Sequence, residues 1–165
     1  MATPATQPPI AEAPPFVADA RQYATFLLDG MLFGVDVLQV QEVIRYQQMT
    51  RVPRAPVVVE GLINLRGQIV TAIDMRKRLG FAPRLSDQRP MNVVVQNSEG
   101  VVSLLVDGIG DVVEVEPTQF EAVPETVSLR VREVVAGVFK LKEGLMLVLD
   151  PAKAVNADVD RDGAE

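Results

Sequence analysis

Few residues in this sequence could carry out covalent or acid–base chemistry. The chain of 165 residues contains no cysteine and no histidine. This excludes thiol and imidazole catalysis, disulfides, metal sites with Cys or His ligands, and a phosphoacceptor histidine. Carboxylates remain, and Asp107, Asp111 and Glu114 follow one another closely. A carboxylate-dependent hydrolase is therefore one function class that the sequence leaves open.

A polar turn interrupts an apolar stretch at residues 61–79. The sequence Gly-Leu-Ile-Asn-Leu-Arg-Gly-Gln-Ile-Val-Thr-Ala-Ile-Asp predicts two strands joined by a tight turn at Arg66. Asp74 follows the second strand at a position typical of a helix N-cap. Asn64 and Arg66, held between two buried strands, would be displayed at a fixed place. Such a turn indicates recognition rather than catalysis.

The same pattern recurs near the end of the chain. Residues 137–155 align with residues 61–79 without a gap, so that Gly61, Arg66 and Asp74 correspond to Gly137, Lys142 and Asp150. A looser match pairs Val35-Asp36 with Val106-Asp107. The shared order of these features indicates an internal duplication of one β-rich unit in two copies, which is too few for a solenoid. The alternative is that two amphipathic hairpins resemble each other by composition alone.

The elements that must position these residues are mostly short strands. About ten strands separated by turn signals predict small closed or semi-closed barrels, one for each copy. One helix is expected from Asp36 to about Arg45, with Gln39 completing a capping box. The expected organisation is an Ala/Pro-rich disordered tail (1–20), subdomains of about 21–81 and 90–156 joined by a polar linker, and a frayed end (157–165).

Charge is distributed unevenly along the chain. The net charge is −6, but residues 21–90 carry ten basic and six acidic side chains, and residues 91–165 carry six basic and fourteen acidic ones. A basic and an acidic surface could face different partners. The acidic balance and the 5% aromatic content disfavour nucleic acid as the main ligand. The sequence has no run of about twenty apolar residues that would predict a transmembrane helix, and a cytoplasmic location is expected.

Several motifs together resemble the CheW family of chemotaxis coupling proteins. They are Phe33-Gly-Val-Asp followed by Val40-Gln-Glu-Val, the Asn-Leu-Arg-Gly turn at Asn64, Ile73-Asp-Met-Arg, and Leu105-Val-Asp-Gly-Ile-Gly-Asp-Val. The resemblance covers residues 22–156. It implies a mostly β fold with two SH3-like five-stranded β-barrel subdomains and short helices, and with strands partly exchanged between the barrels.

The resemblance also implies a function without catalysis, metal or cofactor. Such a protein is an adaptor that couples the cytoplasmic tips of methyl-accepting chemoreceptors to the CheW-like regulatory domain of the histidine kinase CheA. It would lie at receptor arrays on the inner face of the membrane, as a monomer alone and in rings in the array. The alternatives are the same role in a pilus-type or other non-flagellar chemosensory system, and a barrel that binds a small ligand.

Matching the family position by position implies a set of partner-binding residues: Val40, Glu42, Gly61, Asn64, Arg66, Ile109 and Val112. An ion pair between Glu42 and Arg66 is expected within this set. Each residue also has a structural interpretation, which is packing for the apolar ones, backbone approach for the glycine and solvent exposure for the charged ones. The sequence departs from the family at Thr71, where proline is typical.

Overall fold

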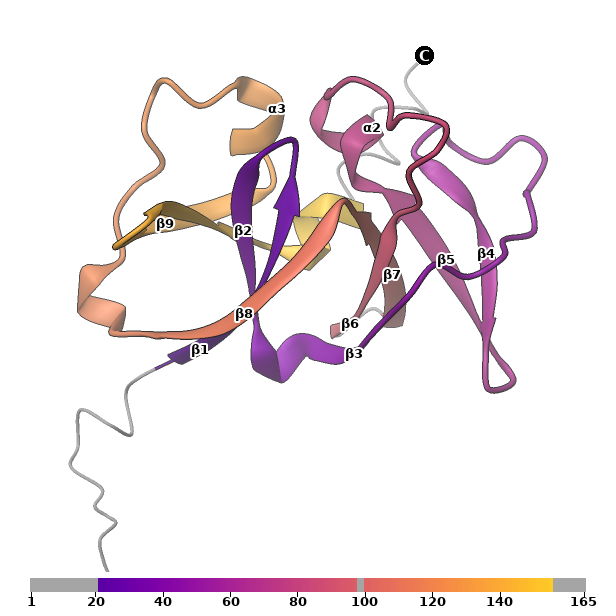
Figure 1. Cartoon of the computed structure of the whole chain (residues 1–165), viewed down its shortest axis with the longest axis horizontal. Coiled ribbons are helices and arrows are strands. Elements are labelled where there is room, and N and C mark those ends of the chain that lie inside the picture. Colours follow the sequence, from indigo (N-terminus) through magenta and orange to yellow (C-terminus); the bar gives the residue numbers. More distant parts are fainter. Residues whose placement is uncertain (1–20, 98–99, 156–165) are drawn as a thin grey trace, which may run out of the picture.

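The computed structural model describes residues 21–97 and 100–155. The expected tail (1–20) and frayed end (157–165) lie outside these residues. Ten strands occupy most of the described chain, and the helices are short (Figure 1). The elements are β1 (Arg21–Leu28), β2 (Met31–Asp36), η3 (Val37–Gln39), β3 (Val40–Ile44), β4 (Val59–Leu65), β5 (Gln68–Asp74), α2 (Met75–Leu79), β6 (Met91–Asn97), β7 (Gly100–Val106), β8 (Gly108–Val115), η4 (Pro117–Gln119), α3 (Leu129–Arg132), β9 (Val135–Leu141) and β10 (Gly144–Leu149).

The strands form two five-stranded sheets with the same internal plan. Their orders are β8-β1-β2-β10-β9 and β3-β6-β7-β5-β4. In each sheet an antiparallel hairpin, β1–β2 or β6–β7, pairs in parallel with the second strand of another hairpin, β10 or β5. The fold is therefore mostly β with two SH3-like five-stranded units, as expected.

Each sheet combines strands from both copies of the repeat. One sheet has β1 and β2 with β8, β9 and β10, and the other has β3, β4 and β5 with β6 and β7. β3 follows β2 in the chain but pairs with β6, and β8 follows β7 but pairs with β1. Each sheet thus takes strands from both halves of the chain, and neither sheet is confined to residues 21–81 or 90–156. In chain order, β3 to β7 are consecutive and form one sheet, whereas the other sheet joins β1 and β2 to β8, β9 and β10.

The prediction of a helix that begins at Asp36 is wrong. Asp36 does act as an N-cap, because its Oδ1 accepts a hydrogen bond from the Leu38 N–H at 2.9 Å, but only the single 3₁₀ turn η3 follows. From Val40 the chain forms β3, with alternating half-buried and exposed residues. A helix of nine or ten residues is marginal in water, and β-branched residues such as Val43 and Ile44 favour a strand once a partner strand is available.

The repeated hairpins are equivalent in detail. The backbone N–H of Asp74 donates to the carbonyl of Val58, and that of Asp150 donates to the carbonyl of Val134, both at 2.8 Å. Each aspartate also caps the helix that follows it, since Asp74 Oδ1 accepts from the N–H of Arg76 at 3.0 Å, and the corresponding bond starts helical residues 151–155. The N-cap prediction for both aspartates is confirmed.

Each sheet is closed by the segment that follows its edge strand, which is β3 in one sheet and β8 in the other. Thr50 pairs with Leu62 of β4, and Glu121 pairs with Val138 of β9, each through two backbone hydrogen bonds of 2.8–2.9 Å. A glycine adjoins each contact. A Cβ on Gly61 would lie 2.7 Å from the carbonyl oxygen of Thr50, and one on Gly137 would lie 2.7 Å from that of Glu121. The matching glycines in the repeat are thus required for the close approach of the closing strand.

Apolar side chains form one large core and two smaller ones. The large core lies between the sheets and takes residues from both, including Phe26, Phe33, Ile73, Val93, Leu104 and Leu147. The small cores belong to single sheets, one around Tyr23, Phe139 and Met146 and the other around Ile63, Leu65 and Val70. The shared core makes the two barrels one packed unit.

A buried arginine connects the helices above the sheets. Arg78 of α2 has no exposed surface, and its Nε donates to the carbonyl of Ala154 at 3.0 Å. Arg130 of α3 in turn donates to the carbonyl of Arg78 at 2.9 Å. Burying a guanidinium is costly unless it is paired and hydrogen-bonded, so these bonds fix α2, α3 and residues 151–155 against one another.

Candidate partner-binding surface

The turn between β4 and β5 displays Arg66 in a defined conformation. Arg66 and Gly67 both have positive φ angles, 53° and 92°, as in the two-residue turns that suit β-hairpins. Asn64 holds the turn, because its Oδ1 accepts a hydrogen bond from the Gly67 N–H at 2.8 Å. Positive φ is uncommon for arginine, so the sequence places a long cationic side chain where glycine or asparagine would be less strained.

Arg66 forms a bidentate ion pair with Glu42. Its two terminal nitrogens donate to the two carboxylate oxygens at 2.9 and 2.8 Å. The Glu42 side chain is 17% exposed and that of Arg66 is 79% exposed. The expected pair is therefore present, although Glu42 comes from strand β3 and not from a helix. The carboxylate orients the guanidinium, whose outer face stays accessible to solvent.

The ion pair also spans the opening of its barrel. β3 and β4 are the two edge strands of their sheet, and Glu42 and Arg66 connect the β3 edge to the turn after β4. Exposed Val43 follows Glu42 in β3 and points to the other face of the sheet, because Glu42 lies opposite Val94 and Val43 opposite Val93. Exposed Ile69 lies opposite Asn64 in β5.

Val43 and Ile69 were not among the candidates from sequence. Ile69 is 60% exposed, whereas the apolar sequence of β5 predicts a buried residue. The exposure of Val43 could have been predicted if residues 40–44 had been interpreted as a strand with alternating faces. Interpreting them as a helix instead places Val43 beside the apolar stripe.

Val40 and Gly61 have structural roles in this fold. Val40 packs against the large core, and Gly61 is buried where the closing strand passes. Neither offers a side chain to a partner in the way that Arg66 does. Both support the surface indirectly, since they hold β3 and β4 in place.

Ile109 and Val112 lie on the other sheet. They are 38% and 56% exposed on β8, an edge strand that crosses the front of the molecule in Figure 1. A side-chain hydrogen bond from Thr25 to the carbonyl of Asp111 fastens β8 to β1. Figure 1 shows the β4–β5 turn projecting from the other sheet. The candidates therefore form two groups, Glu42, Asn64 and Arg66 on one sheet and Ile109 and Val112 on the other.

Asp107 is bound within a charge network. Its carboxylate accepts hydrogen bonds from Arg76 at 2.8 and 2.9 Å, from Arg84 at 3.2 Å and from the Asp29 N–H at 2.8 Å. Burial acts to raise the pKa of Asp107, but the bonds from Arg76 and Asp29 and the charges of Arg76 and Arg84 outweigh it, so that the pKa lies below its ordinary value.

This network gives no support to a carboxylate-dependent hydrolase, because Asp107 is bound by cations. Both oxygens of Asp107 are occupied by donors, so the group is neither a metal ligand nor a general base in this arrangement. Asp111 and Glu114 are exposed on β8. Within residues 21–97 and 100–155, no three carboxylates cluster closely enough to hold a metal ion. The network instead connects the β1–β2 turn, the end of β7, α2 and the segment after it.

Comparison with known proteins points to one family. The chain matches the CheW-like domain over residues 22–159. It is 30% identical over 138 residues to a chemotaxis protein CheW from Klebsiella aerogenes, covering 84% of this chain and 83% of that protein. It is 31% identical over 144 residues to the chemotaxis protein CheW of Rhizobium meliloti, covering 87% and 92%.

A solved structure shares the fold. It is the crystal structure of the scaffolding protein TtCheW from Thermoanaerobacter tengcongensis, with a TM-score of 0.71 and 27% identity, over 79% of this chain and 88% of that one. The two five-stranded units, the Asn-Leu-Arg-Gly turn and a family match over most of the chain all indicate the same family. The chain belongs to the CheW-like family.

Proposed function

We propose that this protein is a non-enzymatic adaptor in a chemosensory pathway. The observation that carries the proposal is the Arg66 turn, where an exposed cation is oriented by Glu42. Relatives of this chain are chemotaxis proteins, and the solved structure that it resembles is a scaffolding protein. The occupied Asp107 carboxylate supports a role without catalysis.

The partners that we propose are methyl-accepting chemoreceptors and the histidine kinase CheA. The two groups of candidate residues lie on different sheets, which suits an adaptor that holds two proteins at once. Glu42, Asn64 and Arg66 form the polar group, and Ile109 and Val112 form the apolar one. Exposed apolar residues such as Ile109 and Val112 are suited to packing against the face of a receptor helix. The location that follows is cytoplasmic, at receptor arrays on the inner face of the membrane. No helix in the described part of the chain is long and apolar enough to cross a membrane.

The opposite charges of residues 21–90 and 91–165 support head-to-tail assembly with the kinase, in which a basic surface would meet an acidic one. A heterologous contact of this kind closes into rings when the rotation permits. Electrostatic attraction between such surfaces weakens as salt rises, because the Debye length falls from about 10 Å at 0.1 M to about 3 Å at 1 M ionic strength. The same proposal applies to flagellar and pilus-type systems.

The test is kinase autophosphorylation with receptor-bearing membranes, with and without this protein and with and without attractant. We expect both activation and its suppression by attractant to require the protein. Arg66→Glu should abolish both. Lys142→Glu is the matched control, because Lys142 occupies the corresponding position in the repeated hairpin and is also exposed. A kinase that responds equally without the protein would refute the adaptor function, and equal loss in both variants would refute the assignment of Arg66.

A further inference from the structure

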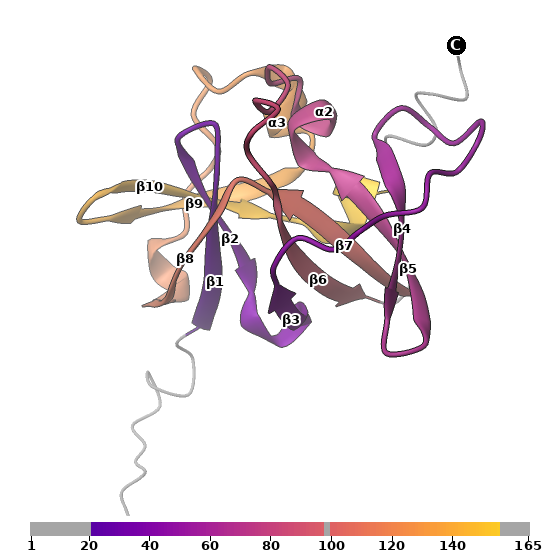
Figure 2. The same cartoon turned by 45° about the vertical axis from the view of Figure 1, so that its right-hand side comes forward.

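A basic pocket lies at the other end of β4 from Arg66. It has a volume of about 430 Å³ and lies between residues 51–57 and α2. Its charged lining consists of Arg51, Arg54, Lys77 and Glu60, with Val52 and Val57 among the apolar residues. Figure 2 shows the connection after β3 rising beyond the end of β4 on the side of α2. The proposed partner surface makes no use of this pocket.

The loop that forms the pocket is held in shape by two turns. The Ala55 N–H donates to the carbonyl of Val52 at 3.3 Å, and the Val59 N–H donates to the carbonyl of Pro56 at 2.9 Å. In the first turn proline precedes Arg54, which has a φ of 67°. Glycine is the favoured residue at this point of such a turn. An arginine there is displayed at a conformational cost, and an outlier of this kind is a reason to look for a ligand.

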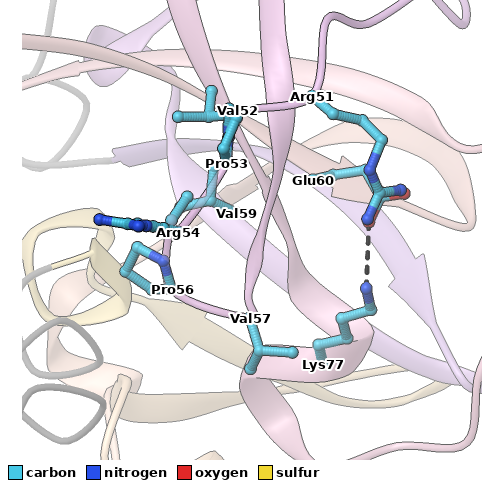
Figure 3. A pocket seen from close by; sticks show the side chains of 10 residues that line it. Arg51, Val52, Pro53, Arg54, Pro56, Val57, Val59, Glu60 and Lys77 are labelled. Carbon is cyan, nitrogen blue, oxygen red and sulfur yellow. Dashed lines mark hydrogen bonds and ion pairs between the residues drawn. The ribbon is translucent and has the colours of Figure 1, made fainter.

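Cations exceed anions in the pocket. Three basic side chains face one carboxylate, and Glu60 already pairs with Lys77 at 3.2 Å. In the view of Figure 3, Arg51 and Lys77 extend toward Glu60 on one side of the pocket, while Arg54 lies on the opposite side. Exposed Val57, at 67%, and Val52, at 37%, add apolar surface. The chemistry that fits is an extended acidic peptide with small apolar residues.

This chain contains such a peptide within reach. Residues 156–165 read Asn-Ala-Asp-Val-Asp-Arg-Asp-Gly-Ala-Glu, with four acidic side chains and one basic one. The described chain leads into them at Val155, directly after Ala154, whose carbonyl accepts a hydrogen bond from Arg78. Lys77 of the pocket is the neighbour of Arg78. Ten residues span up to about 33–36 Å when extended, and they follow Val155, which adjoins the residue bound by Arg78.

We propose that residues 156–165 bind across this pocket of the same molecule, with Asp158, Asp160 and Asp162 facing Arg51, Arg54 and Lys77. Tethering favours this occupant over an acidic peptide from another protein, because a short covalent connection raises the effective concentration to about the millimolar range. The segment would then act as a built-in competitor, and an acidic partner would have to displace it. This inference does not depend on the adaptor function.

Paramagnetic relaxation measured by NMR tests the proposal directly. The chain has no cysteine, so Ala164→Cys gives a single position for a nitroxide label. In the full ¹⁵N-labelled chain at low salt, we expect the label to broaden the amide signals of residues 51–57 and of Lys77. Arg51→Ser with Arg54→Gly should remove most of the broadening at residues 51–57. Both side chains are exposed and glycine suits the φ at position 54, so this variant should fold.

The controls separate this occupant from others. Lys142→Ser, an exposed lysine on the other barrel, should leave the broadening unchanged. Neutralising the segment with Asp158→Asn, Asp160→Asn and Asp162→Asn should remove it. Equal broadening in the wild type and the pocket variant would overturn the proposal, as would equal broadening after neutralisation. Broadening that appears in a mixture of labelled ¹⁴N chains and unlabelled ¹⁵N chains would assign the pocket to a second copy and would also overturn it.

Discussion

Replacing Gly61 by alanine tests whether this residue acts through barrel closure or through partner contact. The new Cβ would lie 2.7 Å from the carbonyl oxygen of Thr50 and 3.1 Å from the Cβ of Met49. Neither neighbour is the flexible end of a side chain, so the closing strand must move. That movement disturbs the two hydrogen bonds between Thr50 and Leu62, at 2.8 and 2.9 Å.

The magnitude follows from these two effects. Overpacking of a well-packed site costs about 1–3 kcal/mol. Each hydrogen bond contributes about 0.5–1.5 kcal/mol, and the pair weakens without being lost completely. We expect Gly61→Ala to lower the free energy of unfolding by about 2–4 kcal/mol. In a chain of this size that corresponds to a fall in Tm of about 5–15 °C.

Gly108→Ala is the matched control for Gly61→Ala. A Cβ on Gly108 would meet only the Leu27 side chain, at 3.9 Å, which is an ordinary contact, and Gly108 does not have a positive φ. Both substitutions reduce the entropy of the unfolded chain equally. The difference between their unfolding free energies therefore reports the clash at Gly61 alone. Urea denaturation of both variants measures it.

Two results would refute this reasoning. The first is equal stability of Gly61→Ala and Gly108→Ala, because the close approach would then have no energetic consequence. The second concerns binding: below its melting transition, folded Gly61→Ala should bind the kinase as the wild type does. A folded variant that fails to bind would show that Gly61 belongs to the partner surface itself.

Three further predictions concern charge. Exchanging the charges in the double variant Glu42→Arg/Arg66→Glu should restore more receptor-dependent kinase activity than is left in either single variant. In unfolding free energy, we expect a coupling energy between the two sites of about 0.5–1 kcal/mol, because Arg66 is exposed; strict additivity of the two substitutions would contradict the pair. Asp107→Asn should destabilise the fold by about 2–3 kcal/mol, since it weakens the charged hydrogen bonds from Arg76. Because the folded-state pKa of Asp107 is lowered, its stabilisation is complete above the unfolded pKa and is lost as pH falls through the folded pKa; acid titration followed by circular dichroism should therefore show a smaller loss in Asp107→Asn than in the wild type. Kinase affinity should fall between low and high salt, and a constant Kd in calorimetry would refute head-to-tail electrostatic association.

The local features of the fold could be predicted because their signals are short-range. The turn at Arg66 and the N-caps at Asp74 and Asp150 each depend on a few adjacent residues. The duplication could be recognised for the same reason, as two hairpins with matching glycine, basic and aspartate positions. Val35-Asp36 and Val106-Asp107 also fall at the ends of the equivalent strands β2 and β7.

Features that depend on distant residues could not be predicted in the same way. β3 has a helical pattern of apolar residues, and only its pairing with β6, some fifty residues later, makes it a strand. The bonds from Arg76 to Asp107 cross 31 residues, and the bond from Asp29 crosses 78. No local pattern indicates such contacts. The exposure of Ile69 likewise depends on which face of β5 is left uncovered.

The sheet registers add a relation between the two groups of candidate residues. Val40 lies opposite Val95, and Ile109 lies opposite Phe26, at the same place in the two hairpins. Continuing along β3 and β8, Val43 corresponds to Val112. The candidates Val40 and Ile109, far apart in the sequence, therefore occupy equivalent positions on the edge strands β3 and β8.

The same registers show how the copies differ. They place Asp111 of β8 where β3 has Glu42, and the repeat places Lys142 where the first hairpin has Arg66. Glu42 and Arg66 form a bidentate pair, whereas within residues 21–97 and 100–155 Asp111 and Lys142 form no ion pair with each other. Arginine offers a planar fork that a carboxylate orients, and lysine offers a point charge on a flexible stem. One barrel thus displays a cation oriented by a carboxylate, and the equivalent edge strand of the other displays Ile109 and Val112, a difference that fits the proposed binding of two different partners.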